Sequence, residues 1–478
     1  MHFQTIDILK EASERWPDKT AVFQSGTSTS FSELHHQTNS LTILLNDFLE
    51  KKGRGIGLLC GNNINFLTGL FASSKVGFVV MPIWKGLHSS EIEAALVVAS
   101  INLILVEKDF RSDFQQKFER RSLNTNFDLI HFPEIFSESI TDKFPNAAFI
   151  RPSSGTTGQS KGVVISHQAV LERIDAANQS LNVKNNDNVL WVLPMAFHFI
   201  VSVILYIRYG ASIIITEDFL PESIIQLANK NKASLLYAGP LHYRLLSTMQ
   251  GNERFNTLKK AISTSASIDQ SIVNKFHDKF DILIQQAFGI IEIGLPLVNT
   301  STDVDKSSSV GIASHAYKIK IFTEDMKPAG ENQPGLLAIK GPGMFSGYLW
   351  PCRKAEDVFH ESWFLTGDIA TIDKDGFVSI IGRSKSVINV SGNKVFPEEI
   401  ENILKLHPDV SDAFVFRTNH ALTGEIPEAE VVRRVGSDLT SDELISFCKK
   451  HLSAIKIPHK IFLVSEIAKT KTGKTLRL

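Results

Sequence analysis

Short apolar runs alternate with longer segments of helical periodicity through the first half of the chain. The apolar runs that predict buried strands are 55–60, 78–82, 102–106, 189–193, 211–216 and 235–238. The segments with helical periodicity are 65–76, 91–99, 168–181, 200–209, 221–231 and 241–250. Residues 1–50 are predicted to be mainly helical, with a short strand pair at 21–23 and 28–31. Strands that alternate with helices are typical of βαβ units, so we expect an α/β fold with mixed, mostly parallel sheets.

The pattern changes near residue 310, where short strands are separated by turns. The strands predicted there are 318–322, 335–340 and 377–381, with a hairpin turn at 373–376. After residue 384 the predicted elements are helix 397–406, strands 410–416 and 428–433, helix 441–451 and strand 460–464. We therefore expect a large N-terminal domain, 1–385, that includes a small β-rich subdomain, and a small α+β C-terminal domain, 386–478.

The length and charge of the chain narrow the classes of function. A chain of 478 residues is too long for one hydrophobic core, which agrees with two domains. Its 50 lysines and arginines balance 51 aspartates and glutamates, which gives no support to a nucleic-acid partner or an acidic membrane surface. The N-terminus lacks the pattern of a secretion signal. The cysteines Cys60, Cys352 and Cys448 lack metal-ligand spacing, so we expect buried thiols in a reducing compartment, the cytoplasm.

One uncharged segment, 189–207, is long enough to be a candidate for a membrane helix. Pro194 and His198 lie inside it, which favours a buried strand, a loop and a buried helix. We therefore expect no membrane span and keep a spanning helix as the alternative.

The clearest candidate for chemistry lies between two apolar runs, 149–150 and 163–165. The hydroxyl, glycine and lysine residues between these runs are Ser153, Ser154, Gly155, Thr156, Thr157, Gly158, Ser160, Lys161 and Gly162. Glycine lets backbone N–H groups crowd around an anion, while hydroxyls and a lysine add donors and charge. This predicts a phosphate-binding hairpin, with a flexible surface turn as the alternative. It is not a Walker loop, because Lys161 precedes Gly162 and an apolar strand follows.

The order Ser-Ser-Gly-Thr-Thr-Gly-x-x-Lys-Gly resembles the phosphate loop of the adenylate-forming superfamily, which includes acyl-CoA synthetases, adenylation domains of peptide synthetases, and luciferases. The family usually has Pro where this chain has Ser160. The resemblance implies ATP binding by the loop residues Ser153, Ser154, Gly155, Thr156, Thr157, Gly158 and Lys161, with Thr157 also close to the metal and the reacting groups.

Two further stretches resemble the acyl and adenine sites of this superfamily. The stretch 193–199 ends in His198-Phe199, and the resemblance implies an acyl pocket formed by His198, Phe199, Ser202, Ser265 and Ala287. A core histidine is the alternative for His198. No Asp stands here to hold a substrate amine, which disfavours amino acids. Small residues at 261–267, with Ser265 and Ala266, resemble the strand end that flanks adenine, and a tightly packed strand end is the alternative.

The stretch Gln286-Ala-Phe-Gly-Ile-Ile-Glu292 resembles the superfamily's Gln-Gly-Tyr-Gly-x-Thr-Glu. The resemblance places Ala287, Phe288 and Gly289 beside adenine and implies that Glu292 holds Mg²⁺. This chain has Ile291 where the superfamily has a phosphate-contacting Thr. A surface carboxylate is the alternative for Glu292, although the isoleucines before it predict partial burial.

The remaining motifs lie toward the C-terminus. Trp363-Phe-Leu-Thr-Gly-Asp368 resembles the superfamily's ribose motif, with Asp368 accepting from the ribose hydroxyls and Arg383 adding a cation. The resemblance makes Lys385 a hinge and places Gly392 on the thiol's approach channel. Gly473-Lys474-x-x-Arg477 resembles the closing motif, so Lys474 is expected to be the catalytic lysine; a solvated basic tail is the alternative.

The resemblance covers nearly the whole chain and implies a two-step reaction. ATP and Mg²⁺ would activate an apolar carboxylic acid to acyl-AMP, and a thiol, coenzyme A first of all, would then displace AMP while the C-terminal domain moves. One alternative is loading onto the phosphopantetheine of an acyl carrier protein. A second, suggested by Ile291, is a degenerate nucleotide-binding protein. We expect a monomer or a homodimer.

Overall fold

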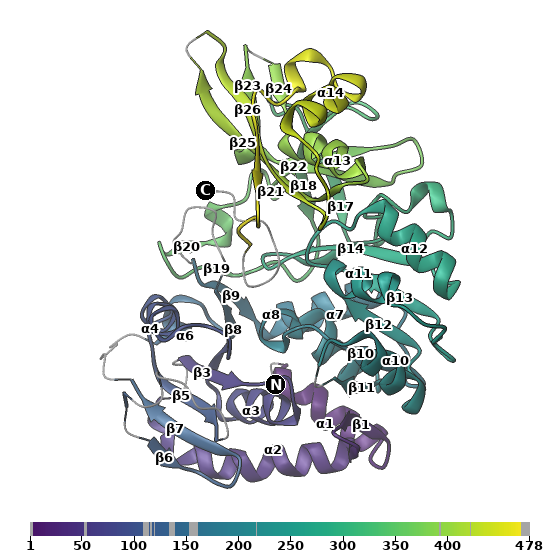
Figure 1. Ribbon diagram of the computed structural model, residues 1–478. Helices are drawn as coiled ribbons and strands as arrows, with labels where there is room; N and C mark the ends of the chain where they lie inside the picture. The colour runs from purple at the N-terminus through teal and green to yellow at the C-terminus, as the bar shows by residue number, and fades with distance from the viewer. Residues whose placement is uncertain are drawn as a thin grey trace. The chain divides into compact units, whose positions relative to one another are not determined.

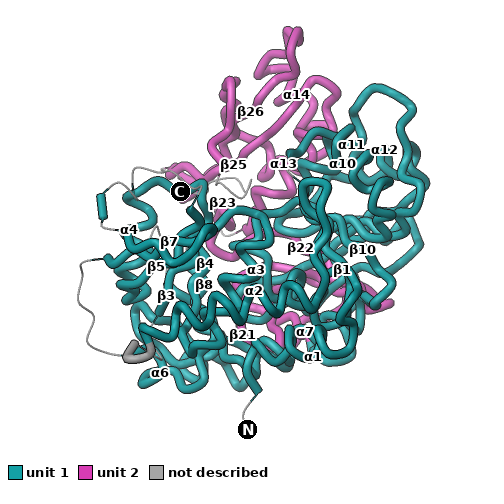
Figure 2. Tube along the Cα trace, turned by 90° about the horizontal axis from the view of Figure 1, so that it is seen from below, with its two compact units in different colours: residues 1–318, 340–362 teal, residues 319–339, 363–478 magenta. Residues whose placement is uncertain are grey.

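The computed structural model describes residues 3–51, 55–108, 114, 117–118, 120–132, 139–152, 161–216, 218–391, 393–420 and 422–469 (Figure 1). The chain divides into two compact units (Figure 2). The first unit contains residues 1–318 and 340–362, and the second contains residues 319–339 and 363–478. The fold is mixed α/β, as the sequence predicts.

The first unit contains two nine-stranded sheets. The strands of one sheet, in spatial order, are β16 (Ile312–Ala313), β15 (Gly294–Val298), β14 (Ile284–Ile290), β13 (Lys260–Ser263), β12 (Leu235–Ala238), β10 (Asn188–Trp191), β11 (Ser212–Ile215), β1 (Thr20–Gln24) and β2 (Thr27–Ser30). From β14 to β1 the neighbours are parallel, with helices α10 (Pro221–Lys230), α11 (Pro240–Thr248) and α12 (Gln270–Phe280) in the connections. An antiparallel hairpin, β14–β15, extends this sheet on one side.

The other sheet of the first unit combines a parallel centre with antiparallel flanks. Its strands, in spatial order, are β20 (Arg353–Lys354), β19 (Gly347–Tyr348), β9 (Val163–Ser166), β8 (Ala147–Arg151), β4 (Val79–Trp84), β3 (Gly55–Cys60), β5 (Ile101–Glu107), β7 (Phe127–His131) and β6 (Arg120–Ser122). Strands β5, β3, β4 and β8 are parallel, whereas β8 and β9 form an antiparallel hairpin. This pairing confirms the two strands predicted on either side of residues 153–160, which themselves lie outside the described residues.

Capping residues in the sequence set the bounds of two helices in the first unit. Helix α3 (Ile64–Val76) starts after Asn63, whose side chain accepts from Phe66 N–H, and ends at Gly77 with a φ of +97°. Helix α7 (His167–Leu181) starts after Ser166, whose hydroxyl accepts from Ala169 N–H, and ends at a left-handed Asn182. The other helices here are α1 (Thr5–Arg15), α2 (Phe31–Leu45), α4 (Ser89–Val98) and α6 (Ile140–Lys143).

The uncharged segment 189–207 is a buried part of the first unit. It forms β10, a loop, helix α8 (Met195–His198), a π-helical segment (Phe199–Ile204) and helix α9 (Leu205–Arg208). The prediction of one regular helix over 200–209 is therefore wrong, because the backbone leaves α-helical geometry at Val201. Within the described ranges, every helix is too short or too polar to cross a bilayer.

The second unit contains two further sheets. Strands β17 (Lys318–Phe322), β18 (Gly335–Lys340), β21 (Phe364–Ile372) and β22 (Val378–Arg383) form one of them. The other contains β24 (Asn393–Val395), β23 (Ile388–Val390), β26 (Gly424–Arg433), β25 (Val410–His420) and β27 (Ile461–Val464), packed against α13 (Pro397–Leu406) and α14 (Ser441–His451). Most of the predicted β-rich subdomain thus belongs to the same compact unit as the C-terminal residues. A functional boundary near residue 385 stays a prediction.

Two cysteines agree with the expected burial and one does not. Cys60 and Cys448 are buried free thiols, whereas Cys352 is exposed. Cys352 lies in the turn between β19 and β20, and its side chain is exposed there. The prediction of a buried thiol is wrong at this position.

Candidate active site

Glu292 lies in the turn between β14 and β15 and is partly buried, as the sequence predicts. Its Oε1 accepts a hydrogen bond of 3.0 Å from the Tyr348 hydroxyl. Tyr348 pairs with Val163 across β19 and β9, and the Lys161 ammonium lies 4.9 Å from the centre of its ring. Burial and the Glu292 carboxylate raise the pKa of Tyr348 above its usual range, so the phenol stays a donor. Tyr348 therefore links the lysine of the phosphate hairpin to the acidic turn.

Arg173 on α7 holds the backbone of the same turn. Its Nη1 donates to the Ile291 carbonyl at 2.7 Å, its Nη2 donates to the Glu292 carbonyl at 2.8 Å, and its Nε donates to the Gly343 carbonyl. The side chain is buried, and burial lowers the pKa of Arg173 to about 10. Gly343 has a φ of +68°, and a Cβ there would lie 2.5 Å from the Arg173 Cγ. All three guanidinium nitrogens are thus used to fix backbone carbonyls.

A second buried arginine, Arg151, ends strand β8. Its Nη2 donates to the Phe197 carbonyl, and its guanidinium carbon lies 5.3 Å from the centre of the Phe199 ring. Burial, together with the Arg173 charge, lowers the pKa of Arg151 to about 10, while Glu292 opposes this shift.

The residues expected around the acyl group are partly brought together. His198 Nε2 lies 3.3 Å from the Ser265 hydroxyl, and Ser265 has a φ of +79° just after β13. Ala287 is buried on the adjacent strand β14. The Asn62 side chain positions the loop before His198 by donating to the Leu193 carbonyl and accepting from Met195 N–H, each at 2.8 Å.

Two other members of the predicted acyl set are deeply buried. The Phe199 ring packs edge-on against Phe149 and Phe66, with centroid separations of 4.9 and 6.1 Å. The Ser202 hydroxyl is buried and has no hydrogen-bond partner in the described part of the chain. Their contacts with an acyl group stay predictions.

Residues expected to contact adenine lie at neighbouring strand ends of the first unit. Strands β13 and β14 run parallel, so Ser265 and Ala266 follow β13 beside the segment Ala287-Phe288-Gly289. Phe288 is half-buried, and Ala266 and Gly289 are exposed. A Cβ at Gly289 would lie 2.5 Å from the Gly294 carbonyl oxygen, so the hairpin requires glycine there.

The ribose motif lies in the second unit. Asp368 and Arg383 face each other across β21 and β22, and Arg383 Nε lies 2.8 Å from Asp368 Oδ1. The Thr366 hydroxyl accepts from Asp368 N–H and donates to the Leu337 carbonyl, which fixes this part of β21 against β18. Lys385 is exposed two residues after Arg383. The structure therefore pairs these two predicted ribose residues with each other, and their contacts with ribose stay predictions.

Several predicted site residues lie outside the described residues. These are Ser153, Ser154, Gly155, Thr156, Thr157, Gly158, Gly392 and Lys474. Among the residues that the structure describes, no group of three or more His, Cys, Asp or Glu side chains could hold a metal ion. Mg²⁺ needs fewer protein ligands, because phosphates and water complete its shell. Glu292 fits the role of such a ligand. Its Oε1 accepts the hydrogen bond from Tyr348, and that bond does not involve its Oε2.

Sequence reasoning missed four residues that shape this region: Asn62, Arg151, Arg173 and Tyr348. Arg151 stands directly before Pro152 of the phosphate motif, which was a usable signal. No local pattern marks Arg173, whose carbonyl partner Ile291 is 118 residues away.

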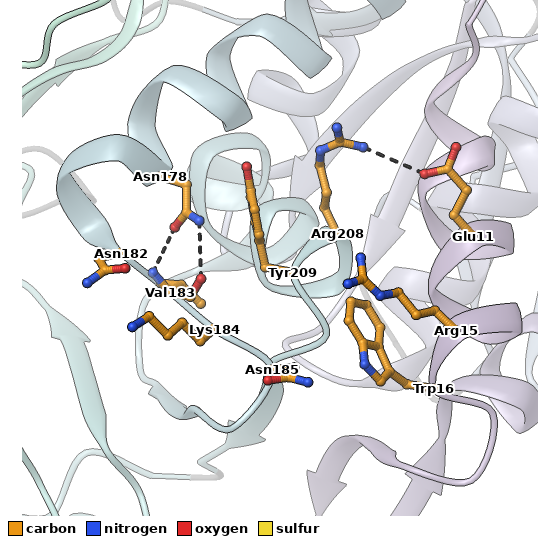
Figure 3. A pocket seen from close by; sticks show the side chains of 10 residues that line it. All are labelled: Glu11, Arg15, Trp16, Asn178, Asn182, Val183, Lys184, Asn185, Arg208 and Tyr209. Carbon is orange, nitrogen blue, oxygen red and sulfur yellow. Dashed lines mark hydrogen bonds and ion pairs between the residues drawn. The ribbon is translucent and has the colours of Figure 1, made fainter.

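A separate surface hollow of about 480 Å³ lies between α1, the end of α7 and α9 (Figure 3). Its lining includes Trp16, Asn178, Lys184, Arg208 and Tyr209. Arg208 is held by Asp175 at 2.7 Å, and Asn178 bonds the Val183 backbone in both directions. None of the predicted site residues lines this hollow.

The sequence matches known family models along most of its length. Residues 9–349 match the AMP-binding enzyme model, and residues 399–474 match the AMP-binding enzyme C-terminal domain. The chain belongs to the AMP-binding enzyme family. One curated relative in this family is 4-coumarate–CoA ligase 3 of Arabidopsis thaliana, 27% identical over 508 residues that cover 100% of this chain and 90% of the relative.

Other proteins resemble the chain with similar coverage. The long-chain-fatty-acid–CoA ligase of Yersinia pestis is 24% identical over 99% of this chain and 93% of its own. The amide bond synthetase McbA from Marinactinospora thermotolerans shares the fold, with a TM-score of 0.86 at 20% identity over 98% of each chain. The adenylate-forming resemblance and the expectation of an AMP-forming acid–thiol ligase are confirmed at the level of the family. The particular acid and acceptor stay predictions.

Proposed function

We propose that this AMP-binding enzyme activates a carboxylic acid with ATP to acyl-AMP and then transfers the acyl group to the thiol of coenzyme A. The observation that carries the proposal is the Glu292 turn: its carboxylate accepts from Tyr348, Arg173 fixes its backbone, and Lys161 lies against the Tyr348 ring. A prearranged acid beside a phosphate-directed cation suits nucleotide phosphates and a divalent metal.

The reaction requires positioning and charge stabilisation more than covalent chemistry. Mg²⁺, when bound, would screen the phosphate charges and polarise their oxygens. Glu292 would hold that ion, and Lys161 with the loop from Ser153 to Gly158 would hold the phosphates. The acid carboxylate would attack the α-phosphate in line and release pyrophosphate, and the thiol would then displace AMP. Holding the reactants in this geometry is the enzyme's main contribution.

The remaining predicted residues receive roles in the same scheme. Asp368 and Arg383 would bind the ribose, while Ser265, Ala266, Ala287, Phe288 and Gly289 would surround adenine. His198, Phe199 and Ser202, with Ser265 and Ala287, would face the acyl group. Lys474 would serve adenylation, Lys385 would act as the hinge, and Gly392 would lie on the thiol's path. The moving part would be residues 386–478, and the reaction would take place in the cytoplasm.

Coenzyme A is proposed as acceptor because the curated relatives named above are acid–CoA ligases that align over nearly the whole chain. A carrier-protein phosphopantetheine is the second candidate, and competition between the two thiols separates them. The third candidate is a nucleotide-binding protein without catalysis, because Ile291 stands where the superfamily resemblance implies a phosphate-contacting Thr.

Acid-dependent exchange of pyrophosphate into ATP tests the proposal directly. We expect exchange with at least one acid from a panel of aliphatic and aromatic acids, and loss of exchange in Glu292→Ala. The control is Glu356→Ala, because Glu356 is an exposed glutamate of the same unit on a surface ion pair with Lys354. A wild-type enzyme that binds ATP but exchanges with no acid would leave the noncatalytic binder as the better description.

A further inference from the structure

Arg151 is a buried cation for which the described residues provide little compensation. The residue is 7% exposed at the end of β8. In the described part of the chain, Arg151 forms no ion pair, and its Nε is buried without a hydrogen-bond acceptor. A buried charge is costly unless an anion and hydrogen bonds compensate it. The arrangement suits a ligand that brings negative charge.

The nearby buried Arg173 shows that a buried arginine in this region can use all of its guanidinium nitrogens as hydrogen-bond donors. Arg173 uses Nε, Nη1 and Nη2 to hold three backbone carbonyls. Within the described residues, Arg151 has one such bond, from Nη2 to the Phe197 carbonyl, and its guanidinium carbon lies 5.3 Å from the centre of the Phe199 ring. Arg173 therefore has a complete structural role, whereas Arg151 keeps part of its donor fork for another partner.

The charges around Arg151 favour an anion over a cation. Arg173 repels it and the carboxylate of Glu292 attracts it, but Glu292 also accepts from Tyr348 and lies beyond ion-pair distance of Arg151. Lys161 adds a further positive charge at the Tyr348 ring. The cations Arg151, Arg173 and Lys161 thus lie in the same region of the first unit as two carboxylates, Glu292 and Glu172, the second of which accepts from Gly343 N–H.

The position of Arg151 in the fold also suits ligand binding. Strand β8 runs parallel to β4, and Arg151 is its last residue. Ligands of open α/β sheets bind beyond the carboxyl ends of parallel strands. The contact with Phe197 brings the guanidinium next to α8, whose last residue is His198.

We propose that Arg151 is a substrate-binding residue that donates to an anionic oxygen, either of the acid's carboxylate or of an ATP phosphate. This inference rests on the proposed function, because it takes the ligands to be a carboxylic acid and ATP. A guanidinium binds carboxylate oxygens and phosphate oxygens equally well in geometry and charge. Kinetic measurements are therefore needed to decide whether the acid or ATP supplies the oxygen.

The test uses the full-length enzyme with Arg151→Lys and Arg151→Gln. In pyrophosphate exchange we expect Arg151→Gln to raise the KM of one substrate about tenfold to a hundredfold, the usual effect of losing a hydrogen bond to a charged group. Arg151→Lys keeps the charge and should recover part of that loss. A rise confined to the acid assigns the carboxylate, and a rise confined to ATP assigns the phosphate.

The control is Arg208→Gln, since Arg208 is a partly buried arginine of the same unit that lies in the surface hollow and pairs with Asp175. It should leave both KM values unchanged. If Arg151→Gln and Arg151→Lys fold and keep both wild-type KM values, Arg151 only supports α8 and the inference is wrong. If the wild type exchanges with no acid, the proposed function is wrong, but the role of Arg151 can still be tested. The dissociation constants of ATP for wild type and Arg151→Gln are then compared by equilibrium dialysis. Equal dissociation constants would overturn the inference.

Discussion

At the scale of single residues, buried polar side chains decide the chemistry of the first unit. Tyr348 donates to Glu292, Arg173 holds the carbonyls of the adjacent turn, and Arg151 keeps an unused donor. Burial shifts the pKa of Tyr348, Arg173 and Arg151 in the direction that favours the neutral form of each. A neighbouring charge or hydrogen bond can strengthen or oppose that shift. These side chains therefore act as one charged cluster.

Removal of the Tyr348 hydroxyl should weaken metal binding at Glu292. Tyr348→Phe deletes the donor that orients the carboxylate, and loss of such an outer hydrogen bond typically costs about 10–100-fold in metal affinity or activity. We expect the half-saturating Mg²⁺ concentration in pyrophosphate exchange to rise within that range. Tyr209→Phe is the matched control, because Tyr209 also donates to a carboxylate, that of Asp175, at the surface hollow. An unchanged Mg²⁺ dependence in Tyr348→Phe would contradict this role.

His167 should make the enzyme less stable in mild acid. Its Nδ1 accepts from Thr5 N–H at 3.0 Å, and burial lowers the pKa of His167 to about 4 from its ordinary 6.5. Because the unfolded chain binds the proton more readily, stability is full above pH 6.5 and falls as the pH drops toward 4. This residue should account for about 2 kcal/mol between pH 7.5 and pH 5.

The measurement is the free energy of unfolding of wild type and His167→Gln at these two pH values. Glutamine keeps an acceptor for Thr5 N–H but does not titrate, so the pH dependence of the variant should be smaller. Equal pH dependence in both proteins would show that His167 does not carry the effect.

At the scale of elements, helix α7 connects the N-terminal helix to the acidic turn. Its first residue, His167, bonds Thr5 at the start of α1, and Arg173 reaches the β14–β15 turn and Gly343. Glu172, the neighbour of Arg173, accepts from Gly343 N–H at 2.7 Å. The helix thus fixes both chain segments that position Glu292 and Tyr348.

Arg173→Met should loosen the β14–β15 hairpin more than any other part of the first unit. The partly buried carbonyl of Ile291 would lose its guanidinium donor, and leaving a fully buried group unsatisfied costs about 1–3 kcal/mol. We expect amide hydrogen exchange in peptides covering 284–298 to accelerate by roughly tenfold or more, with a smaller change in Arg173→Lys. Peptides from α13 and α14 in the second unit serve as internal controls. Uniform acceleration in all peptides would indicate global destabilisation instead.

At the scale of the whole molecule, the predicted site residues are divided between two compact units. Glu292, Tyr348, Arg173 and Arg151 belong to the first unit, while the Asp368–Arg383 pair belongs to the second. A two-step reaction can use such a division, because a mobile unit can present different residues to each step. We therefore propose that the second unit presents one set of residues during adenylation and another set during thioester formation.

Lys474 should therefore be needed for adenylation and dispensable for thioester formation. Lys474→Ala should lose acid-dependent pyrophosphate exchange, yet still convert supplied acyl-AMP and coenzyme A to the thioester. One lysine on a moving segment serves only the step in which that segment brings it to the phosphate. Lys469→Ala, a neighbouring lysine that contacts Asp412, is the control and should keep both half-reactions. Equal losses in both half-reactions of Lys474→Ala would contradict the alternation.

The sequence by itself determined the features that depend on local pattern. Hydrophobic periodicity gave strand β3 at 55–60, strand β12 at 235–238 and helices α13 and α14 with the bounds found in the structure. The hairpin β8–β9 also followed from a short motif. These features are local because propensity, capping and turn chemistry act over a few residues.

Tertiary structure alone decided which distant side chains meet. Arg173 reaches carbonyls 118 and 119 residues later in the chain, and Tyr348 reaches Glu292 across 56 residues. The π-helical segment after His198 and the grouping of β17, β18, β21 and β22 with the C-terminal residues likewise have no local signal. Packing selects such contacts by shape and by the need to satisfy buried polar groups, and neither is encoded in the spacing of residues along the chain.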